Sequence, residues 1–255
     1  MALIITPISK MPLIQPGDDL ADIILSALQV NQINLRDGDI LVLAQKIVSK
    51  AEGRLINLTA VIPSKRAIEL ARSCEKDPRL VELILQESND VLRVRPGSLI
   101  VEHRLGFICA SAGIDHSNVR GVSGNPEDWV LLLPEDPDLS AREIRRKLEN
   151  SSGASIGVMI IDSHGRAWRL GVVGTCIGLS GIPALIDERG WQDLFGYKLK
   201  ITIVGAADEL AAAASLVIGE AAEGTPAAHV RGFPYSLRES SLQELIRPKD
   251  QDMFR

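Results

Sequence analysis

The sequence predicts an α+β fold with mixed β-sheets. Helical start signals and short β-branched or apolar runs are interspersed along the 255 residues, without the regular strand-helix alternation of a simple doubly wound sheet. The chain contains no internal repeat and no low-complexity segment. Hydrophobic residues make up 45% of it, enough to bury the core of one large domain or two modest ones.

Four segments carry the signals of a helix start. In each, a residue that favours the N-cap position precedes a stretch with helical periodicity, and Pro or Glu supports two of the starts. The expected helices cover 21–29 after Asp18, 65–73 after Ser64, 79–88 after Asp77 and Pro78, and 144–150 after a capping box of Ser140 and Glu143.

Short β-branched or apolar runs between these helices are typical of strands. They cover 39–49, 98–110, 129–134, 156–162, 170–178 and 198–207. The region 120–138 is the most linker-like, because Gly, Pro and acidic residues crowd around one short strand. We expect one domain over 1–255, with any subdivision between 120 and 140.

Charge and cysteine usage exclude several classes of protein. The net charge is −5 and no block of Lys or Arg stands out, which argues against nucleic-acid binding. The three cysteines, Cys74, Cys109 and Cys176, form no CxxC pair and therefore fit neither a disulfide framework nor a thiolate zinc site. We expect a protein of the reducing cytoplasm.

No targeting or membrane segment is expected. Pro7 and Pro12 interrupt the N-terminus before a signal-peptide core can form. The Ala-rich stretch 210–222 is broken by Gly219 and Glu220 and is shorter than the roughly twenty residues that span a bilayer. It predicts a buried helix.

Polar side chains end an apolar run in SAGIDHSNV, residues 111–119. Asp115, Ser117 and Asn118 follow the apolar segment 105–110. Residues of these types commonly form turns by hydrogen-bonding their own backbone, so a turn is one interpretation. The other is a functional site, in which a strand delivers polar groups at its end.

A second apolar run ends at Asp162, which is followed by Ser163 and His164. A carboxylate and a hydroxyl at the end of a buried strand suit a hard cation, since Mg²⁺ and Mn²⁺ prefer oxygen ligands. A turn capped by Asp162 is the alternative. His164 is expected to face solvent or a hydrogen-bond partner rather than a metal.

Lys46, Lys50 and Arg54 recur four residues apart after a strand. On a helix this spacing puts the three cations on one face, where they would stabilise a phosphate. A solvated basic face is the alternative. Neither the GxxxxGK[ST] pattern nor the GxGxxG pattern of common nucleotide-binding loops is present.

The loop after the Ala-rich stretch exposes Glu220 and Glu223 between small residues. Small residues let backbone N–H groups approach a phosphate, and a carboxylate can hold the accompanying cation. The alternative is an ordinary helix end capped by Gly219. If Glu220 converges with Asp115 and Asp162, the cluster needs a counter-ion, because two carboxylates about 4 Å apart repel by roughly 1 kcal/mol in water.

Six segments, taken in order, resemble one family. MPLIQPGDDL, VSKAEGR, SAGIDHSNV, DSHGR, RLGVVGTCIGLSG and AAHVRG are similar to segments of the coenzyme F420-0:L-glutamate ligases, also called F420 gamma-glutamyl ligases. No single segment decides the resemblance, but together they run through nearly the whole chain. The resemblance implies an α+β fold particular to the family and an intertwined homodimer.

The resemblance also implies the reaction. It implies a GTP-dependent ligase that activates F420-0 as an acyl phosphate and joins L-glutamate to it through a gamma-linked amide, with F420-1 as a further candidate acceptor. The implied cofactors are Mg²⁺ or Mn²⁺ at two sites and, in some members, K⁺. A ligase for another acyl acceptor, a metal-dependent GTP phosphohydrolase and a non-catalytic nucleotide-binding protein stay open as alternatives. No histidine is singled out as a general base.

Matching positions carry the site residues that the resemblance implies. One cation is implied at Asp115 and Asp162, and a second at Ser163 and Glu220. The implied contacts of the guanine nucleotide are Met11, Pro12, Leu13, Ile14, Gln45, Lys46, Lys50, Asn118, Ile218, Gly219, Glu220, Ala221, Ala222, Glu223, Gly224 and Thr225.

The chain departs from the family's pattern at these positions. Gln45-Lys46 stands where some members have Ser-Thr, Ser163 where they have Thr, and Ala221-Ala222 where they have Gly. Ser163 keeps the hydroxyl that a metal needs, whereas the alanine pair leaves less room for a phosphate. Some bacterial members carry a further, flavin-reductase-like domain, which we do not expect here.

Overall fold

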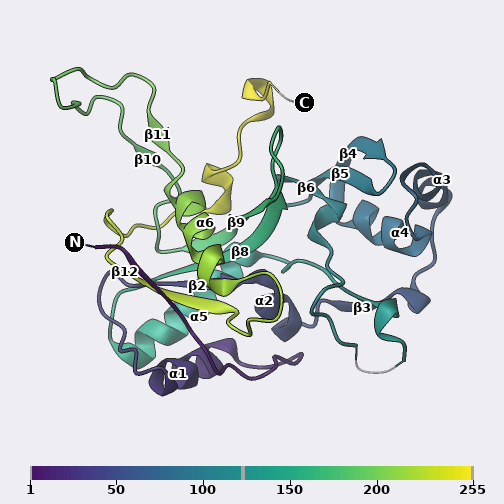
Figure 1. Ribbon diagram of the computed structural model, residues 1–255, viewed down its shortest axis with the longest axis horizontal. Coiled ribbons are helices and arrows are strands. Elements are labelled where there is room, and N and C mark those ends of the chain that lie inside the picture. The colour runs from purple at the N-terminus through teal and green to yellow at the C-terminus, as the bar shows by residue number, and fades with distance from the viewer. Residues whose placement is uncertain (1, 122–123, 254–255) are drawn as a thin grey trace.

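The computed structural model describes residues 2–121 and 124–253 (Figure 1). Its helices are α1 (Leu20–Val30), α2 (Gln45–Ala51), α3 (Lys65–Cys74), α4 (Pro78–Gln86), α5 (Pro137–Ser152) and α6 (Ala206–Ile218). Its strands are β1 (Ile4–Pro7), β2 (Ile40–Ala44), β3 (Leu55–Asn57), β4 (Ser88–Arg95), β5 (Ser98–His103), β6 (Ile108–Ala110), β7 (Trp129–Leu131), β8 (Gly157–Gly165), β9 (Val172–Ser180), β10 (Ile186–Asp187), β11 (Ile203–Val204) and β12 (Ala227–Arg231).

A five-stranded sheet forms the centre of the protein, in the order β1-β12-β2-β8-β9. The β2–β8 pair is parallel, and the other neighbours are antiparallel. Helices together with mixed sheets confirm the α+β prediction. Because β2 and β8 run in the same direction, their carboxyl ends lie at the same edge of the sheet.

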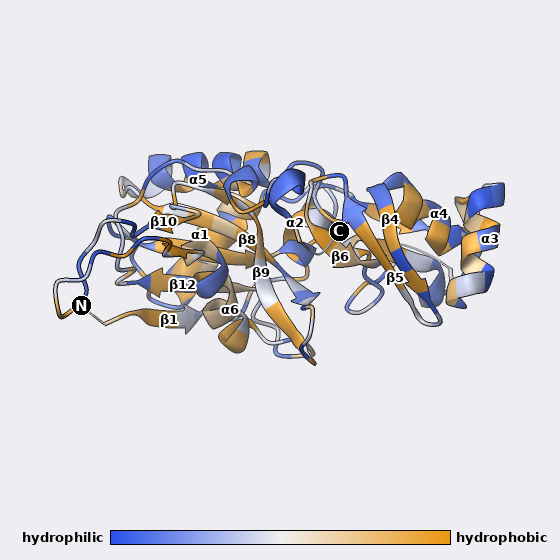
Figure 2. Ribbon diagram, turned by 90° about the horizontal axis from the view of Figure 1, so that it is seen from above, coloured by the Kyte–Doolittle hydropathy of each residue, from blue (hydrophilic) through white to orange (hydrophobic). Residues whose placement is uncertain are grey.

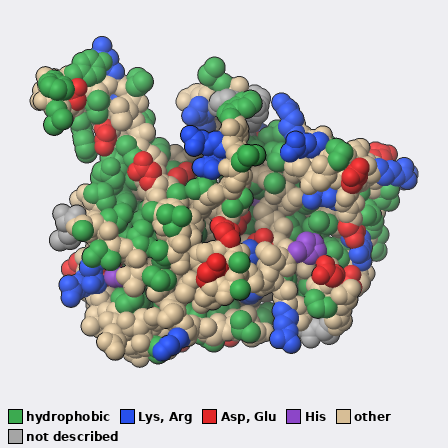
Figure 3. Space-filling view, in the orientation of Figure 1, with side chains coloured by type: hydrophobic (Ala, Val, Ile, Leu, Met, Phe, Trp, Pro, Cys, Tyr) green, Lys and Arg blue, Asp and Glu red, His purple; other side chains and the backbone are tan. Residues whose placement is uncertain are grey.

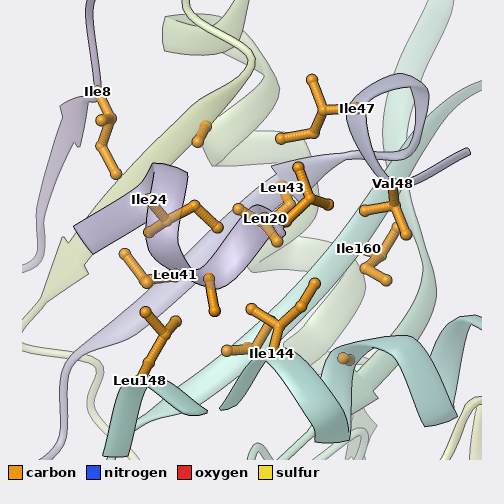
Figure 4. Packing of buried hydrophobic residues seen from close by; sticks show 14 of the residues in the cluster. Ile8, Leu20, Ile24, Leu41, Leu43, Ile47, Val48, Ile144, Leu148 and Ile160 are labelled. Atoms are coloured by element: carbon orange, nitrogen blue, oxygen red, sulfur yellow. The ribbon is translucent and has the colours of Figure 1, made fainter. Parts of the chain in front are cut away.

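Helices cover both faces of this sheet. Figure 2 shows α5 on one side and α6 on the other. Successive side chains of a strand point to opposite faces, so Leu41 and Leu43 of β2 pack in the core that includes α1 and α5, while Val42 packs toward α6. Figure 4 shows the first of these cores, where Ile24 and Ile144 lie close to the two leucines.

A smaller lobe lies beside the central sheet. It comprises α3, α4 and the three-stranded sheet β4-β5-β6, which share a separate core. Arg54, just after α2, joins this lobe to the rest: its Nη2 lies 2.9 Å from Oε1 of Glu87. The other Glu87 oxygen accepts a hydrogen bond from Nε of Arg104 over 2.9 Å. Two guanidinium groups thus hold one half-buried carboxylate between α4 and β5.

Strands β10 and β11 carry an arm, residues 188–202, that projects from the body (Figure 1). Figure 3 shows hydrophobic side chains gathered toward its end. Leu194 is 97% exposed, Phe195 94% and Ile201 88%. Large apolar side chains concentrated on one projecting segment are unusual for a surface that meets only water.

The starts of α3 and α4 confirm Ser64 and Asp77 as caps, whereas two other predicted caps are wrong. Asp19, not Asp18, caps α1, since its carboxylate accepts the N–H groups of the first turn. The predicted capping box of Ser140 and Glu143 lies inside α5. That helix begins earlier because Pro137 fits its first turn and the carboxylate of Asp136 caps it.

The predicted strand runs overlap β2, β8 and β9 of the central sheet, whereas β1 and β12 of the same sheet lie in no predicted run. The run 39–49 is a strand only over β2 and turns into α2 at Gln45, and the run 198–207 is a strand only over β11. The Ala-rich stretch is the predicted buried helix, α6. None of the described helices combines the length and apolarity needed to cross a bilayer. Positions 122–123 of the predicted boundary region lie outside the described residues.

Candidate active site

The predicted polar groups begin where the parallel pairing of β2 with β8 ends, although β8 itself continues to Gly165. Ala44, the last residue of β2, pairs with Ile161 of β8. The next residues along the two segments are Gln45 and Lys46 on one, and Asp162 and Ser163 on the other. Parallel register therefore brings a lysine, a carboxylate and a hydroxyl to one edge of the sheet, although they are far apart in the chain.

Asp115 is held against the start of α2. Its backbone forms an isolated bridge with Leu131, which fixes the loop after β6 beside β7. Its Oδ2 lies 2.7 Å from Nζ of Lys46 and accepts a hydrogen bond from Nε2 of Gln45 over 2.6 Å. Gln45 is 1% exposed, and its own carbonyl accepts a hydrogen bond from the Ser49 hydroxyl. These hydrogen bonds fix the orientation of the Gln45 amide, which in turn holds the Asp115 carboxylate in place.

The charges at this edge perturb one another. Burial raises the pKa of Asp115; the nearby ammonium of Lys46 opposes this effect, and the charge of Asp162 adds to it. Burial, followed by repulsion from Lys46, lowers the pKa of Lys50. Asp115 and Asp162 are therefore close enough to repel, as the sequence predicted for a converging pair. Lys46 supplies a compensating positive charge from within the protein.

Asp162 and Ser163 point to opposite faces of β8, as neighbouring residues in a strand do. Asp162 lies on the face of His164, whose Nε2 is 3.1 Å from Oδ2 of Asp162. On the other face, the hydroxyl of Ser163 donates to Oε1 of Glu220 over 2.6 Å. Helix α6 packs on this second face and ends just before Glu220. The predicted donors thus lie on opposite sides of β8, Asp162 on one side and the Ser163–Glu220 pair on the other.

Asn118 joins the loop after β6 to the loop after α6. Its side-chain amide donates to the carbonyl of Ala221 over 2.8 Å, and its own carbonyl accepts a hydrogen bond from Nζ of Lys50 over 2.7 Å. The carboxylate of Glu223 accepts the N–H of Ala221. The hydroxyl of Thr225 donates to the carbonyl of Ile218 and closes the loop 218–225. Residues of α2 and of both loops therefore meet at one place.

The segment Met11–Ile14 is less clearly part of this group. It lies near the end of α2, since the N–H of Gly17 donates to the carbonyl of Ala51 over 2.8 Å. Leu13 is 80% exposed, whereas Ile14 is buried in the core. Within 2–121 and 124–253, no hydrogen bond or ion pair joins residues 11–14 to the other predicted nucleotide contacts.

The donor atoms at the strand end suit a hard divalent cation. All of them are carboxylate or hydroxyl oxygens, which Mg²⁺ and Mn²⁺ prefer. Among the described residues, no group of three or more His, Cys, Asp or Glu side chains is arranged to hold a metal. Each pair, Asp115 with Asp162 and Ser163 with Glu220, would supply only two side chains to a cation, so phosphate oxygens and water would have to complete its coordination.

Two contacts at this site are not indicated by any single sequence motif. The resemblance implies only a nucleotide role for Gln45, yet its amide also holds Asp115. His164 was expected to face solvent or a hydrogen-bond partner, and the structure places it against Asp162. The two-residue spacing of a strand face was the available signal for the second contact. No local signal announced the first, because the residues are seventy positions apart.

Comparisons with known proteins identify the family of this chain. The sequence profile of the family described as F420-0:Gamma-glutamyl ligase matches residues 9–232. The chain is 45% identical to the coenzyme F420:L-glutamate ligase of Methanothermobacter thermautotrophicus, over 100% of both chains. It is 46% identical to the same-named protein of Methanopyrus kandleri over 98% of this chain and 97% of that one. For Archaeoglobus fulgidus the identity is 41%, over 100% and 97%. The chain belongs to the F420-0:gamma-glutamyl ligase family.

Proposed function

We propose that this chain is a GTP-dependent ligase that adds L-glutamate to coenzyme F420-0 through a gamma-linked amide. F420-1 is the second candidate acceptor. The observation that carries the proposal is the meeting of Lys46, Asp115, Asp162 and the Ser163–Glu220 pair at one sheet edge. A cationic side chain grouped with oxygen donors in this way suits a nucleoside triphosphate. The family description supports F420-0 and the gamma linkage, the names of the relatives support coenzyme F420 and L-glutamate, and GTP rests on the resemblance alone.

The chemistry requires that a carboxylate be activated before an amine can attack it. A carboxylate oxygen of the acceptor attacks the γ-phosphorus of GTP, forming an O–P bond as the bond to GDP breaks. The glutamate nitrogen then attacks the acyl carbon, inorganic phosphate leaves, and the nitrogen loses a proton. Most catalysis of phosphoryl transfer comes from positioning and from neutralising charge. In this proposal, Lys46 and Lys50 would neutralise phosphate oxygens, and Asn118 would orient the nucleotide.

Two divalent cations, Mg²⁺ or Mn²⁺, complete the proposed site, with K⁺ as a further candidate. Asp115 and Asp162 would hold one, and Ser163 and Glu220 the other. When bound, such cations neutralise phosphate charge and align attacking and leaving oxygens. The nucleotide would also contact Gln45, the loop 218–225 and the segment 11–14. Ala221 and Ala222 narrow that loop compared with glycine, and the carbonyl of Ala221 is already engaged by Asn118.

The direct test mixes the purified protein with F420-0, GTP, Mn²⁺ and L-glutamate and examines the products by mass spectrometry. We expect a glutamyl adduct, GDP and phosphate in equal amounts. Phosphate release without any adduct and independent of glutamate would instead indicate a phosphohydrolase. Tight GTP binding without turnover would indicate a nucleotide-binding protein. Glutamate-dependent GDP formation only with another carboxylate would identify a different acyl acceptor.

We further propose that the protein is a homodimer of the cytoplasm. Exposed Leu194, Phe195 and Ile201 on the arm support a partner surface, and the resemblance names a second copy. Phe195→Glu should then shift the molecular mass measured by light scattering toward the monomer, while Ile62→Glu, at an exposed apolar residue outside the arm, should not. Cys74, Cys109 and Cys176 are free and buried, which suits a reducing compartment.

A further inference from the structure

His164 and Asp162 form a fixed pair on one face of β8. The two residues are separated by a single position, so their side chains project from the same face of a regular strand. Nε2 of the ring lies 3.1 Å from Oδ2 of the carboxylate. An ionised carboxylate only accepts hydrogen bonds, so the ring nitrogen is the donor.

The ring of His164 is held by its surroundings. Its side chain is 9% exposed, and the ring of Phe107 lies 5.2 Å from it, centroid to centroid. Phe107 is in turn stacked on His103 at 4.9 Å, with 3° between the planes. Phe107 also packs against three separate core clusters. Few ring orientations are therefore open to His164, and its donor stays aimed at Asp162.

The two carboxylates of the proposed first cation site are held in the same manner. Oδ2 of Asp115 is engaged by Gln45 and Lys46, and Oδ2 of Asp162 by His164. In the part of the chain that the structure describes, no hydrogen bond reaches Oδ1 of either aspartate. Each carboxylate is therefore fixed through one oxygen and leaves the other available.

We propose that His164 is a positioning residue that orients the Asp162 carboxylate for a divalent cation. The inference rests on the proposed function, because it presumes that Asp162 holds a cation there. Hydrogen bonds to a ligating carboxylate fix its orientation, and loss of such a partner typically weakens metal binding by about 10- to 100-fold. A histidine that only filled space between Phe107 and the strand would have no such effect.

Two substitutions separate orientation from packing. His164→Phe keeps an aromatic ring beside Phe107 and removes the donor. His164→Gln places an amide N–H near the position of Nε2 and removes the ring. The matched control is His116→Phe, the same exchange at an exposed histidine. His164→Leu repeats the loss of the donor should His164→Phe fail to fold, and thermal melts compare the variants.

The primary measurement is Mn²⁺ binding to the protein without nucleotide, followed by electron paramagnetic resonance. We expect Mn²⁺ to bind His164→Phe at least about tenfold more weakly than it binds wild type. His164→Gln should recover part of this affinity, and His116→Phe should bind Mn²⁺ as wild type does. In steady-state turnover, the fold increase in the Mn²⁺ concentration that gives half-maximal rate should exceed the fold decrease in kcat. Equal Mn²⁺ affinity in wild type and His164→Phe would overturn the role of His164 alone. No Mn²⁺ binding by the wild type, either alone or in the presence of GDP, would overturn the cation site itself.

Discussion

The side-chain amide of Asn118 donates to the carbonyl of Ala221 across 2.8 Å, although the two residues lie 103 positions apart. This single bond joins the loop that carries Asp115 to the loop that carries Glu220. Asn118 also has a left-handed backbone, with φ of 56°, which asparagine and glycine tolerate better than most residues. The residue thus serves both as a turn and as a link between two sides of the site.

Asn118→Gly should keep the backbone and break this link. We expect KM for GTP to rise about 2- to 12-fold, which corresponds to the usual worth of one hydrogen bond, while kcat changes less. Steady-state kinetics at saturating glutamate measures both. Asn89→Gly, in the smaller lobe, is the comparison. An unchanged KM for GTP would mean that the link does not shape the nucleotide site.

Lys46→Met should remove the positive charge that faces Asp115. We expect kcat/KM for GTP to fall by about 100-fold or more, as when one charge-stabilising donor is lost from an active site. Lys65→Met, an exposed lysine at the start of α3, is the matched control and should behave as wild type. A near-normal kcat/KM for Lys46→Met would show that other groups neutralise the charge of the phosphates.

Asp162→Asn should abolish cation-dependent turnover and leave the fold intact, because an amide has no negative charge to hold a divalent cation. We expect kcat at limiting Mn²⁺ to fall by about 100-fold or more, with a thermal melting temperature close to that of wild type. Asp90→Asn, at an exposed strand position, controls for the loss of one charge. Wild-type turnover at limiting Mn²⁺ would contradict the assignment of Asp162.

Glu87→Ala should destabilise the protein strongly, because it leaves Arg54 and Arg104 without their shared partner. We expect a loss of about 3–5 kcal/mol in the free energy of unfolding, measured by urea denaturation. Glu69→Ala, an exposed glutamate of α3, should cost far less. A loss for Glu87→Ala no larger than that of Glu69→Ala would show that the arginine pair does not depend on this carboxylate.

The same carboxylate contributes a pH dependence at the acid end. Burial alone would raise the pKa of Glu87, but the hydrogen bond from Arg104 and the charge of Arg54 outweigh it and hold the pKa below 4.5. The stabilisation is therefore complete above pH 4.5 and is lost as the pH falls through the lowered pKa.

His103 predicts a separate pH dependence. Burial lowers its pKa from 6.5 to about 4, so the unfolded chain binds a proton at a higher pH than the folded one does. Stability should fall as the pH drops from 6.5 toward 4, by about 3 kcal/mol in all. His103→Phe should flatten this part of the unfolding curve, and His116→Phe should not. An unchanged slope in His103→Phe would exclude His103 as the source.

The sequence predicted strands that form apolar, β-branched runs better than the other strands, for a physical reason. Runs such as 156–162 are buried on both faces and therefore almost wholly apolar, which marks them as strands. β4, in contrast, has an exposed pattern interrupted by bulges, and no run of apolar residues announces it. Ser140 and Glu143 match a capping box, but nothing local reveals that Asp136 and Pro137 start the helix earlier.

The site was predictable as a set of residues, through their resemblance to a family, but not as an arrangement. The sequence alone does not say that β2 and β8 are parallel neighbours, and this pairing is what brings Lys46 to Asp162. The contacts of Gln45 with Asp115 and of Asn118 with Ala221 are likewise tertiary. The roles of these residues in binding GTP and cations stay predictions.

The ion pair between Lys46 and Asp115 has a thermodynamic consequence for the order in which ligands arrive. A cation on the available Oδ1 of Asp115 would repel the ammonium that lies against Oδ2, and a phosphate that binds Lys46 would draw the ammonium away. Either ligand therefore bears the cost of breaking the pair, and the second ligand does not bear it again. Linkage of this kind is reciprocal. Cation and nucleotide should thus bind with positive cooperativity, so that the empty site and the fully occupied site are both favoured over a site that holds one ligand.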